Sequence, residues 1–508
     1  MRTNKVSEKA ITEIIELSRN AVNKEDVTKV KRAVMKKYGI SNILKDSDIY
    51  LKSGLSVFKR KPSRNLSGVS VVAVMTSPAK CPHGKCVFCP GGVDNNTPQS
   101  YTGYEPAALR GKENNYDPYL QVKNRIKQYL SIGQVPGKVE LIIMGGTFTA
   151  RSWSYQKNFV KECLRALNNS KTGSLKIMQK VNETANYRCV GLTVETRPEQ
   201  ITKKSINKLL TLGATRVELG VQSAFDNVLK ANNRGHSVND VIKATKLLKN
   251  SGFKINYHLM TNMVLSTPKL DYESFRKIFR DENFKPDMVK IYPTLLIKGT
   301  KLYELFLEKK WKPYTKIETI KLIGRIKRLI PEYVRVMRIQ RDIPSNNIEQ
   351  DLKNSNLRQL VKSYMDLKGW KCKCIRCREA MRNKGNFKEL RYKTLKYLAS
   401  GSTEYFIEAV DKSDLLFGFI RLRIVDKKLF VRELHVYGEQ IIVGEEGSVQ
   451  HKGIGKKLLS MAQELAVKNK LNEILIISGV GVREYYKKLG YVLKNFYMAK
   501  RLGFLSNY

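Results

Sequence analysis

Apolar residues near the start of the chain recur every three or four positions, which is the spacing of one face of an amphipathic helix. They comprise Ile11, Ile14, Ile15 and Val22, followed by Val27, Val30, Val34 and Tyr38. Gly54, Pro62, Ser63 and Ser67 then mark a stretch of loop-forming residues. We therefore predict a helical region over residues 1–68.

From residue 69 onward, short apolar runs alternate with segments of helical pattern. The runs cover residues 69–78, 138–148, 188–198, 216–223, 254–260 and 288–294. Strands that alternate with helices predict βα units joined into a parallel sheet, and near-continuous apolar character suits strands that are buried on both faces. We therefore predict a partial βα-barrel over residues 69–335, with its site at the carboxyl ends of the strands.

The pattern changes twice more toward the end of the chain. Residues 336–395 are predicted to form a linker. After residue 396, the stretch FGFIRLRIVDKKLFVRELHVYG holds two β-type runs around a Lys-Lys turn, and an amphipathic helical segment and another apolar run follow. We predict a second, separate α/β domain over residues 396–508.

The charge of the chain points to a polyanionic partner. Lys and Arg number 93 against 46 Asp and Glu, so the formal net charge is +47. Such an excess predicts binding to RNA or DNA, and the N-terminal helices are the first candidate for the contact. A lysine-rich proteome and a merely solvated helical bundle are the alternatives. With no secretory signal and no apolar run of roughly 20 residues, we expect a soluble, cytoplasmic chain with reduced thiols and no membrane contact.

Three cysteines follow the first predicted strand with the spacing C-x4-C-x2-C: Cys81, Cys86 and Cys89. Three thiolates leave a tetrahedral zinc site one ligand short. They can instead bind three irons of a 4Fe-4S cluster and leave the fourth iron open for a small molecule. A zinc knuckle that borrows His83 is the alternative.

A second group, Cys372, Cys374 and Cys377, lies in the predicted linker with the spacing C-x-C-x2-C. Three thiols within six residues suit a structural zinc ion that ties two domains together, although the sequence shows no fourth ligand. A second iron–sulfur cluster and three unrelated free cysteines are the alternatives.

The stretch QHKGIG, residues 450–455, stands between a β-type segment and an amphipathic helix. Backbone N–H groups at such a turn, together with the following helix N-terminus, can cradle a pyrophosphate. The stretch fits the pattern Q/R-x-x-G-x-G/A and resembles the acetyl-coenzyme A loop of GNAT-type N-acetyltransferases. The cysteine loop, together with MGGTFT at 144–149, resembles the radical S-adenosylmethionine superfamily.

Further motifs make the resemblance more specific: CPGG, QSYTGYEP, ETRP, GVQS, NRGH, RDIP and RELHVYG. With them, nearly the whole chain resembles the family of the Elongator catalytic subunit, in a stand-alone archaeal form without other Elongator subunits. That resemblance implies an enzyme that modifies carbon 5 of the wobble uridine, position 34 of transfer RNA, to 5-carboxymethyluridine. A radical derived from S-adenosylmethionine would activate the methyl group of acetyl-coenzyme A. The anticodon stem-loop would be the partner, and an unknown donor would supply the electron.

The resemblance also assigns roles to individual residues. For S-adenosylmethionine it implies Gly145, Gly146, Thr147, Glu195 and Gln222. For acetyl-coenzyme A it implies Lys138, Glu433, Leu434, His435, Val436, Gln450, Gly453, Ile454, Gly455, Lys456 and Tyr486. As catalytic residues it implies Tyr485, Tyr486 and Lys290. Structural hydrogen bonding by Glu195 and Gln222, a surface position for Lys138 and core packing of the tyrosine pair are the alternatives.

One loop departs from the family pattern. Where the family has His-x-Met-Pro-x-Leu-Pro, this chain reads HLMTNMVLSTP, with Thr261 and Val264 in the places of the two prolines. The loop should affect substrate positioning or rate and leave the cluster intact. Two other functions stay open: a protein lysine acetyltransferase with the barrel as scaffold, and a non-catalytic RNA-binding scaffold.

Overall fold

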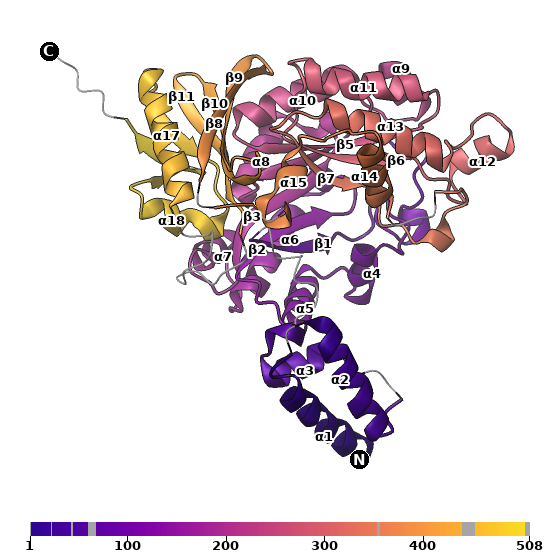
Figure 1. Ribbon diagram of the computed structural model, residues 1–508. Helices are drawn as coiled ribbons and strands as arrows, with labels where there is room; N and C mark the ends of the chain where they lie inside the picture. Colours follow the sequence, from indigo (N-terminus) through magenta and orange to yellow (C-terminus); the bar gives the residue numbers. More distant parts are fainter. Residues whose placement is uncertain are drawn as a thin grey trace.

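A computed structural model describes residues 2–21, 23–41, 44–58, 68–352, 356–383, 385–387, 389–438 and 453–502. Three helices form a small bundle that projects from the rest of the molecule (Figure 1): α1 (Arg2–Leu17), α2 (Lys24–Lys37) and α3 (Asp46–Ser53). Its own core contains Ile14, Val34 and Ile49, and Asn23 caps α2 by accepting hydrogen bonds from two backbone N–H groups. The helical prediction for this region is confirmed.

The central domain is an open half-barrel. In the described part of the chain its sheet has seven parallel strands in sequence order: β1 (Ser70–Met75), β2 (Lys138–Met144), β3 (Arg188–Thr196), β4 (Arg216–Gln222), β5 (Lys254–Thr261), β6 (Met288–Pro293) and β7 (Arg335–Ile339). Six of these strands were predicted. The seventh strand lies where the linker was expected. It was not predicted because RVMRI is short and only Val336 and Ile339 are buried.

Helices connect the strands and cover the outer face of the sheet (Figure 1). They are α4 (Pro106–Glu113), α5 (Pro118–Ser131), α6 (Trp153–Asn168), α7 (Leu175–Asn182), α8 (Lys203–Leu212), α9 (Asp226–Ala231), α10 (Val238–Asn250), α11 (Pro268–Arg280), α12 (Lys301–Leu307) and α13 (Lys316–Leu329). After β7 the linker forms α14 (Leu357–Leu367), which packs on α13, then α15 (Ile375–Arg378) and α16 (Ala380–Asn383). As far as the chain is described, no helix has the length and apolar composition needed to cross a bilayer.

The C-terminal domain contains a second sheet, whose described strands run in the order β13-β14-β12-β11-β10-β9-β8. The strands are β8 (Arg391–Ala399), β9 (Ser402–Val410), β10 (Leu416–Val425), β11 (Lys428–Val436), β12 (Glu473–Ile476), β13 (Val492–Lys494) and β14 (Tyr497–Arg501). All neighbours are antiparallel except β11 and β12. The helix α17 (Ile454–Lys468) packs on β10 and β11, and α18 (Arg483–Lys487) follows a short 3-10 turn, η7 (Val480–Val482). The separate α/β domain is confirmed.

The two large domains share a buried interface. Phe406, Phe419, Ile477 and Val480 of the C-terminal domain belong to the same apolar core as the half-barrel. A Cβ atom on Gly479 would lie 2.3 Å from the carbonyl oxygen of Val190 in β3. Such close backbone packing holds the C-terminal sheet against the end of the half-barrel where its strands begin.

Candidate active site

The first cysteine group lies on the loop that follows β1, at the carboxyl end of the parallel sheet. Cys86 and Cys89 are buried and Cys81 is half-buried. Arg234 Nη1 donates to Cys86 Sγ at 3.1 Å, and Gln99 Nε2 donates to Cys89 Sγ at 3.0 Å. Buried N–H donors aimed at sulfur stabilise thiolates, so these residues fit a 4Fe-4S cluster with one open iron.

His83 is a poor fourth ligand for a metal ion at this loop. Its Nε2 atom lies 3.1 Å from Cys86 Sγ and also 3.1 Å from Arg197 Nη1. A metal cation on Nε2 would therefore stand beside a fixed guanidinium charge, which repels it. The contact disfavours the alternative of a zinc knuckle.

The glycines of MGGTFT lie beside the cysteine loop. Gly145 and Gly146 have φ angles of +123° and +97°, which other residues rarely adopt, and a Cβ on Gly145 would lie 2.2 Å from Thr76 Oγ1. Thr147 Oγ1 is 3.5 Å from Cys81 Sγ. Near the cysteines, residues 145 and 146 therefore present backbone without side chains. A ligand held between this glycine segment and the cysteine loop needs that space.

Glu195 and Gln222 lie at the carboxyl ends of β3 and β4. The Glu195 carboxylate accepts a hydrogen bond from Tyr101 Oη at 2.9 Å and lies 3.7 Å from Lys290 Nζ. Gln222 has a φ of +70°, and its buried Oε1 has no hydrogen-bond partner among the described groups. Backbone strain and an unpartnered acceptor at a strand end are typical of a position that contacts a ligand.

Lys290 belongs to a buried charge cluster on the inner face of the half-barrel. Its ammonium group contacts the Glu218 carboxylate, which also accepts from His258 Nε2 at 2.7 Å and from Asn256 Nδ2 at 3.0 Å. Burial lowers the pKa of Lys290, but the charge of Glu218 outweighs burial and raises it above the ordinary value. Lys290 therefore stays protonated, so it is not suited to proton abstraction.

Glu195, Glu218 and His258 have ligand atoms within 4.8 Å of one another, as in a metal site. The Lys290 ammonium, however, pairs with both carboxylates. A fixed cation at this place repels a metal ion, so the group is better explained as an internal ion-pair network.

The polar inner face reaches the C-terminal domain along β5. Lys254, Asn256 and His258 alternate along this strand and therefore share a face. Lys254 Nζ lies 3.8 Å from the Glu433 carboxylate of β11, while Asn256 and His258 contact Glu218. Polar groups thus connect the predicted acetyl-coenzyme A strand with the interior of the half-barrel.

The structure brings several predicted acetyl-coenzyme A residues together. The pairing of β11 with β12 ends at Val431, so residues 433–436 lie beyond it. A Cβ on Gly455 would lie 3.1 Å from Tyr485 Oη and within 4.0 Å of the Val436 and Leu434 side chains. These groups surround the N-terminus of α17, where a pyrophosphate would be stabilised.

The other predicted residues of this group differ in position. Gly453 caps α17 with a φ of +86°, Ile454 is buried and Lys456 is exposed on the first turn. The His435 ring stacks on Phe419, and burial lowers its pKa. Gln450 lies outside the described residues.

The two tyrosines of α18 have different surroundings. Tyr485 is 37% exposed and its hydroxyl group points to α17, whereas Tyr486 is 6% exposed and packs on Tyr491 in the domain core. Of the pair, only Tyr485 can meet a ligand without rearrangement of the core.

Lys138 lies at the opposite end of β2 from Gly145. The strand has seven residues, which at about 3.3 Å per residue separates its ends by ~20 Å. Lys138 pairs in register with Arg188, whose Cβ would lie 2.6 Å from a Cβ on Gly481 of η7. Lys138 is therefore beside the C-terminal domain and far from the cysteine loop, and burial lowers its pKa.

The second cysteine group is compact. The Cys372, Cys374 and Cys377 sulfurs lie within 4.8 Å of one another, and the backbone N–H of Ile375 donates to the Val334 carbonyl, which fastens the group to the half-barrel beside β7. No His, Asp or Glu of the described chain joins them at that distance. The three sulfurs could hold a zinc ion or an iron–sulfur cluster with one ligand from elsewhere.

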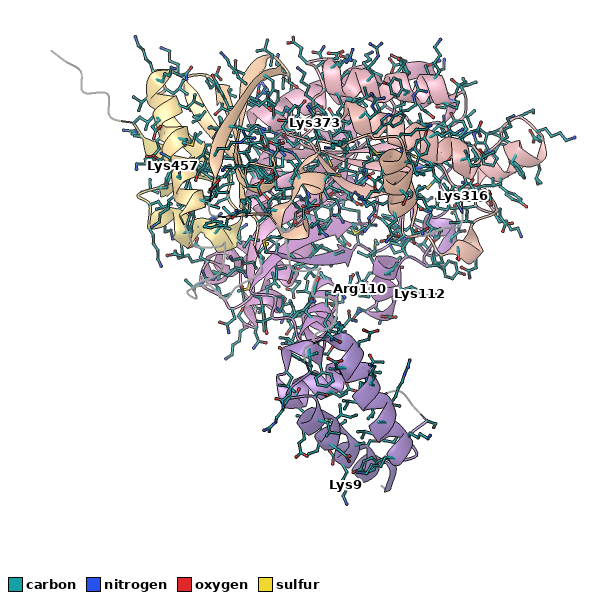
Figure 2. All side chains as sticks on the ribbon, viewed as in Figure 1. Lys9, Arg110, Lys112, Lys316, Lys373 and Lys457 are labelled. Carbon is teal, nitrogen blue, oxygen red and sulfur yellow. The ribbon has the colours of Figure 1, made fainter. Side chains whose placement is uncertain are left out.

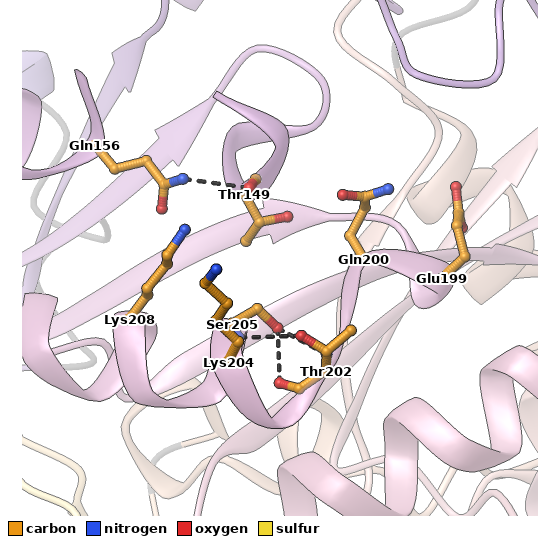
Figure 3. Close-up of a pocket in the computed structure, with 8 residues that line it drawn as sticks. All are labelled: Thr149, Gln156, Glu199, Gln200, Thr202, Lys204, Ser205 and Lys208. Atoms are coloured by element: carbon orange, nitrogen blue, oxygen red, sulfur yellow. Dashed lines mark hydrogen bonds between the residues drawn. The ribbon is translucent and has the colours of Figure 1, made fainter. Parts of the chain in front are cut away.

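A pocket of about 170 Å³ opens beside the N-terminus of α8 (Figure 3). It is smaller than the roughly 300 Å³ or more that ligand pockets usually offer, and none of the predicted site residues lines it. Its lining residues are Thr149, Gln156, Glu199, Gln200, Thr202, Lys204, Ser205 and Lys208. We assign it no part in the chemistry.

Sequence reasoning missed several groups that shape this site, namely Tyr101, Glu218, His258 and Arg234. Glu218 stands in RVELGVQ, an otherwise apolar strand, and is 1% exposed. A carboxylate in a strand predicted to be buried needs a cation, and that requirement was the signal available in the sequence. Tyr101 and Arg234 lie in the motifs QSYTGYEP and NRGH, but their roles were missed because their partners are distant in sequence.

Fold and site together define a radical S-adenosylmethionine half-barrel joined to an N-acetyltransferase domain. The Radical SAM superfamily model matches residues 75–281, the Radical_SAM C-terminal domain model residues 286–366, and the Acetyltransferase (GNAT) family model residues 374–491. These domain types imply a 4Fe-4S cluster, S-adenosylmethionine and acetyl-coenzyme A.

Curated relatives define the family more closely. The chain is 50% identical over 471 residues to the tRNA uridine(34) acetyltransferase of Methanocaldococcus infernus, which covers 88% of each chain. It is 38% identical over 510 residues to human Elongator complex protein 3, covering 94% of this chain and 93% of that protein. A solved structure of the archaeal Methanocaldococcus infernus Elp3, lacking residues 1–46, matches with a TM-score of 0.76 and 45% identity over 86% of this chain and all of the other. The chain belongs to the tRNA uridine(34) acetyltransferase and Elongator complex protein 3 family.

Proposed function

We propose that this chain modifies carbon 5 of uridine 34 in transfer RNA, using S-adenosylmethionine and acetyl-coenzyme A to form 5-carboxymethyluridine. The observation that carries the proposal is the placement of two sites at the two ends of one half-barrel. The cysteine loop and Gly145 stand at the carboxyl end of the sheet, and Lys138, β11 and α18 stand at the other end. The uracil and the acetyl group would meet between them, on the polar inner face.

Residues of the chain take distinct roles in this proposal. Cys81, Cys86 and Cys89 hold the cluster, which with S-adenosylmethionine supplies the radical that activates the acetyl methyl group. Gly145, Gly146, Thr147, Glu195 and Gln222 hold S-adenosylmethionine. Lys290, kept charged by Glu218, donates a hydrogen bond to a substrate, and Tyr485, whose hydroxyl group lies beside Gly455, contacts acetyl-coenzyme A.

Basic side chains support transfer RNA as the partner. Figure 2 labels Lys9 on α1, Arg110 and Lys112 on α4, Lys316 on α13, Lys373 in the linker and Lys457 on α17, so basic side chains occur on the helical bundle, the half-barrel, the linker and the C-terminal domain. A phosphate backbone is attracted to such a surface without sequence readout. The anticodon stem-loop would be held this way by a stand-alone cytoplasmic enzyme, with the electron supplied by a separate donor.

We further propose that Cys372, Cys374 and Cys377 hold a structural zinc ion. Their compact geometry and their place between the two domains support a clip. A second iron–sulfur cluster is the alternative, and metal analysis of a Cys374→Ala variant separates the two, since either zinc or iron should be lost.

The test is an anaerobic reaction with reconstituted iron and sulfide, S-adenosylmethionine, acetyl-coenzyme A and unmodified transfer RNA, followed by mass spectrometry of the nucleosides. We expect carboxymethyl on uridine, lost in Cys86→Ala and in Gly455→Glu and retained in Cys163→Ala, whose thiol lies in the barrel core. Deoxyadenosine without modified uridine would show that the acceptor is misassigned. Efficient peptide acetylation without transfer RNA would instead support the hypothesis that the chain is a protein lysine acetyltransferase.

A further inference from the structure

Of the NRGH motif at residues 233–236, only Arg234 has a part in the site described above, as a donor to Cys86 Sγ. The motif follows α9, and together with Asn232 it begins the connection from α9 to α10. Residues 232–235, named here the cradle segment, lie against the cysteine loop at every position. Asn232 is fully buried, while Asn233 and Gly235 are exposed.

Two contacts of the cradle segment hold the backbone of the cysteine loop. The carbonyl oxygen of Asn232 accepts from the N–H of Val87 at 3.2 Å, and Asn233 Nδ2 donates to the carbonyl oxygen of Lys85 at 2.8 Å. These two loop residues flank Cys86 in sequence. The two hydrogen bonds therefore fix the backbone on both sides of the central cysteine.

The other two contacts concern side chains of the loop. Arg234 donates through Nη1 to Cys86 Sγ at 3.1 Å and through Nη2 to the Gly220 carbonyl of β4 at 2.7 Å. Gly235 has a φ of +66°, and a Cβ there would lie 2.6 Å from the Cβ of His83. A larger residue at 235 would push His83 and the loop outward.

The cradle segment is itself fixed from the other side. Asn232 Nδ2 donates to the Val264 carbonyl at 3.0 Å, and Asn232 Oδ1 accepts from the Val264 N–H at 3.1 Å. Proline, which the family pattern has at position 264, lacks that N–H and could not make the second bond. In this chain, position 264 is valine, and Asn232 accepts a hydrogen bond from the backbone N–H that a proline there would lack.

We propose that the cradle segment positions the cluster-binding loop, and that Asn232 links this loop to residues 262–265. The inference rests on the cluster that the proposed function assigns to Cys81, Cys86 and Cys89. Gly84, at the loop tip, is exposed and has open space around it, so the loop has little support of its own at that point. Three cysteines on such a loop bind iron well only if their geometry is set beforehand, and the cradle segment sets it.

The test uses two variants with matched controls. Asn233→Asp keeps a side chain that tolerates a positive φ but turns the donor to Lys85 into an acceptor, and Asn495→Asp is the same change at an exposed turn with φ +54°. Gly235→Ala adds both strain and the clash with His83. Gly369→Ala adds the strain alone, since Gly369 has φ +65° and nothing within 4 Å.

We would measure iron bound per chain after reconstitution, the rate at which a ferrous chelator removes it, and the electron paramagnetic resonance spectrum of the reduced cluster with and without S-adenosylmethionine. For Asn233→Asp we expect about five-fold faster iron loss, the equivalent of about 1 kcal/mol for one hydrogen bond. For Gly235→Ala we expect a larger loss and an altered spectrum. The thermal shift on adding acetyl-coenzyme A should be unchanged in both.

Each outcome bears on the inference. If the variants load and retain iron as their controls do, with the wild-type spectrum, the cradle segment does not position the cysteine loop. The proposed function would be unaffected by that result. Controls that lose iron equally would also overturn the inference, because general strain would then explain the effect. A wild-type chain that takes up no cluster would overturn both this inference and the proposed function.

Discussion

Lys249 of the half-barrel donates to both carboxylate oxygens of Glu404 in the C-terminal domain, each at 3.0 Å, and both side chains are fully buried. Arg423 and Arg432 also bind Glu404, and Arg432 reaches back to Asp287 of the half-barrel. Within the described residues, this network crosses the domain boundary with Lys249, Lys254, Arg421, Arg423 and Arg432 as cations and Glu404, Asp287 and Glu433 as anions. The relative placement of the two domains is therefore set by charges that are almost entirely buried.

Removing one anion from this network should be more harmful than removing one cation. Glu404→Gln leaves five cations against two anions, whereas Lys249→Met leaves four against three. Because an uncompensated buried charge costs about 3–5 kcal/mol, we expect Glu404→Gln to lower the free energy of unfolding by roughly that amount and Lys249→Met to lower it by less. Urea denaturation of both variants measures this, and equal losses would contradict the charge argument.

Gly479→Ala should separate the domains locally. The new Cβ would lie 2.3 Å from the Val190 carbonyl oxygen, so backbone must move. We expect faster proteolysis at the boundary and loss of the acetyl-coenzyme A thermal shift, because η7 positions α18. Gly191→Ala is the control, since its Cβ meets nothing nearer than 3.5 Å. Similar protease sensitivity in both variants would argue against the packing role.

The tyrosines of α18 should have separable effects. Tyr485→Phe removes only the exposed hydroxyl near Gly455, so we expect product formation to fall roughly ten-fold or more with little change in stability. Tyr486→Ala empties a core site and should cost about 3–5 kcal/mol. Tyr486→Phe, which keeps the ring, should be close to wild type in activity. Activity assays and urea midpoints for the three variants test the assignment, and the reverse pattern would make Tyr486 the functional residue.

The sequence predicted the strands that are apolar and bounded by helices, because burial on both faces leaves a strong local pattern. It missed β7, whose Arg335 and Arg338 alternate with buried residues. Arg335 is stabilised by Glu379 at 2.8 Å and by the Tyr437 hydroxyl at 2.7 Å. Such partners are known only once the fold brings distant segments together.

The candidate site shows the same division. Motifs with fixed spacing, such as the cysteines and the glycines after β2, could be read from the sequence because their chemistry is local. The Lys290–Glu218–His258 network could not, since its members come from three strands. Nor could the sequence distinguish Tyr485 from Tyr486, because they are consecutive residues of one helix. A shift of one residue in the position of that helix would exchange the side chain that enters the core.

Asp271, which lies beside loop 262–265, should make the stability of the enzyme depend on pH. Its carboxylate is 3% exposed and accepts from the Asn262 N–H at 2.8 Å and from Tyr314 Oη at 2.9 Å, and burial raises its pKa to about 6. A carboxyl whose pKa is higher in the folded state binds a proton more tightly there. Stability is therefore lost as pH rises from about 4 to about 6, and the loss persists above that range.

Asp271→Asn should remove this dependence, because an amide oxygen can accept both hydrogen bonds without a charge. We expect the variant to match wild type near pH 4 and to exceed it above pH 6 by at most about 3 kcal/mol, the equivalent of roughly two pKa units. Urea midpoints of both proteins at pH 4, 5, 6 and 7.5 measure the difference. A variant that is less stable at pH 7.5 would show that the carboxylate is held charged by partners, and that loop 262–265 depends on that charge.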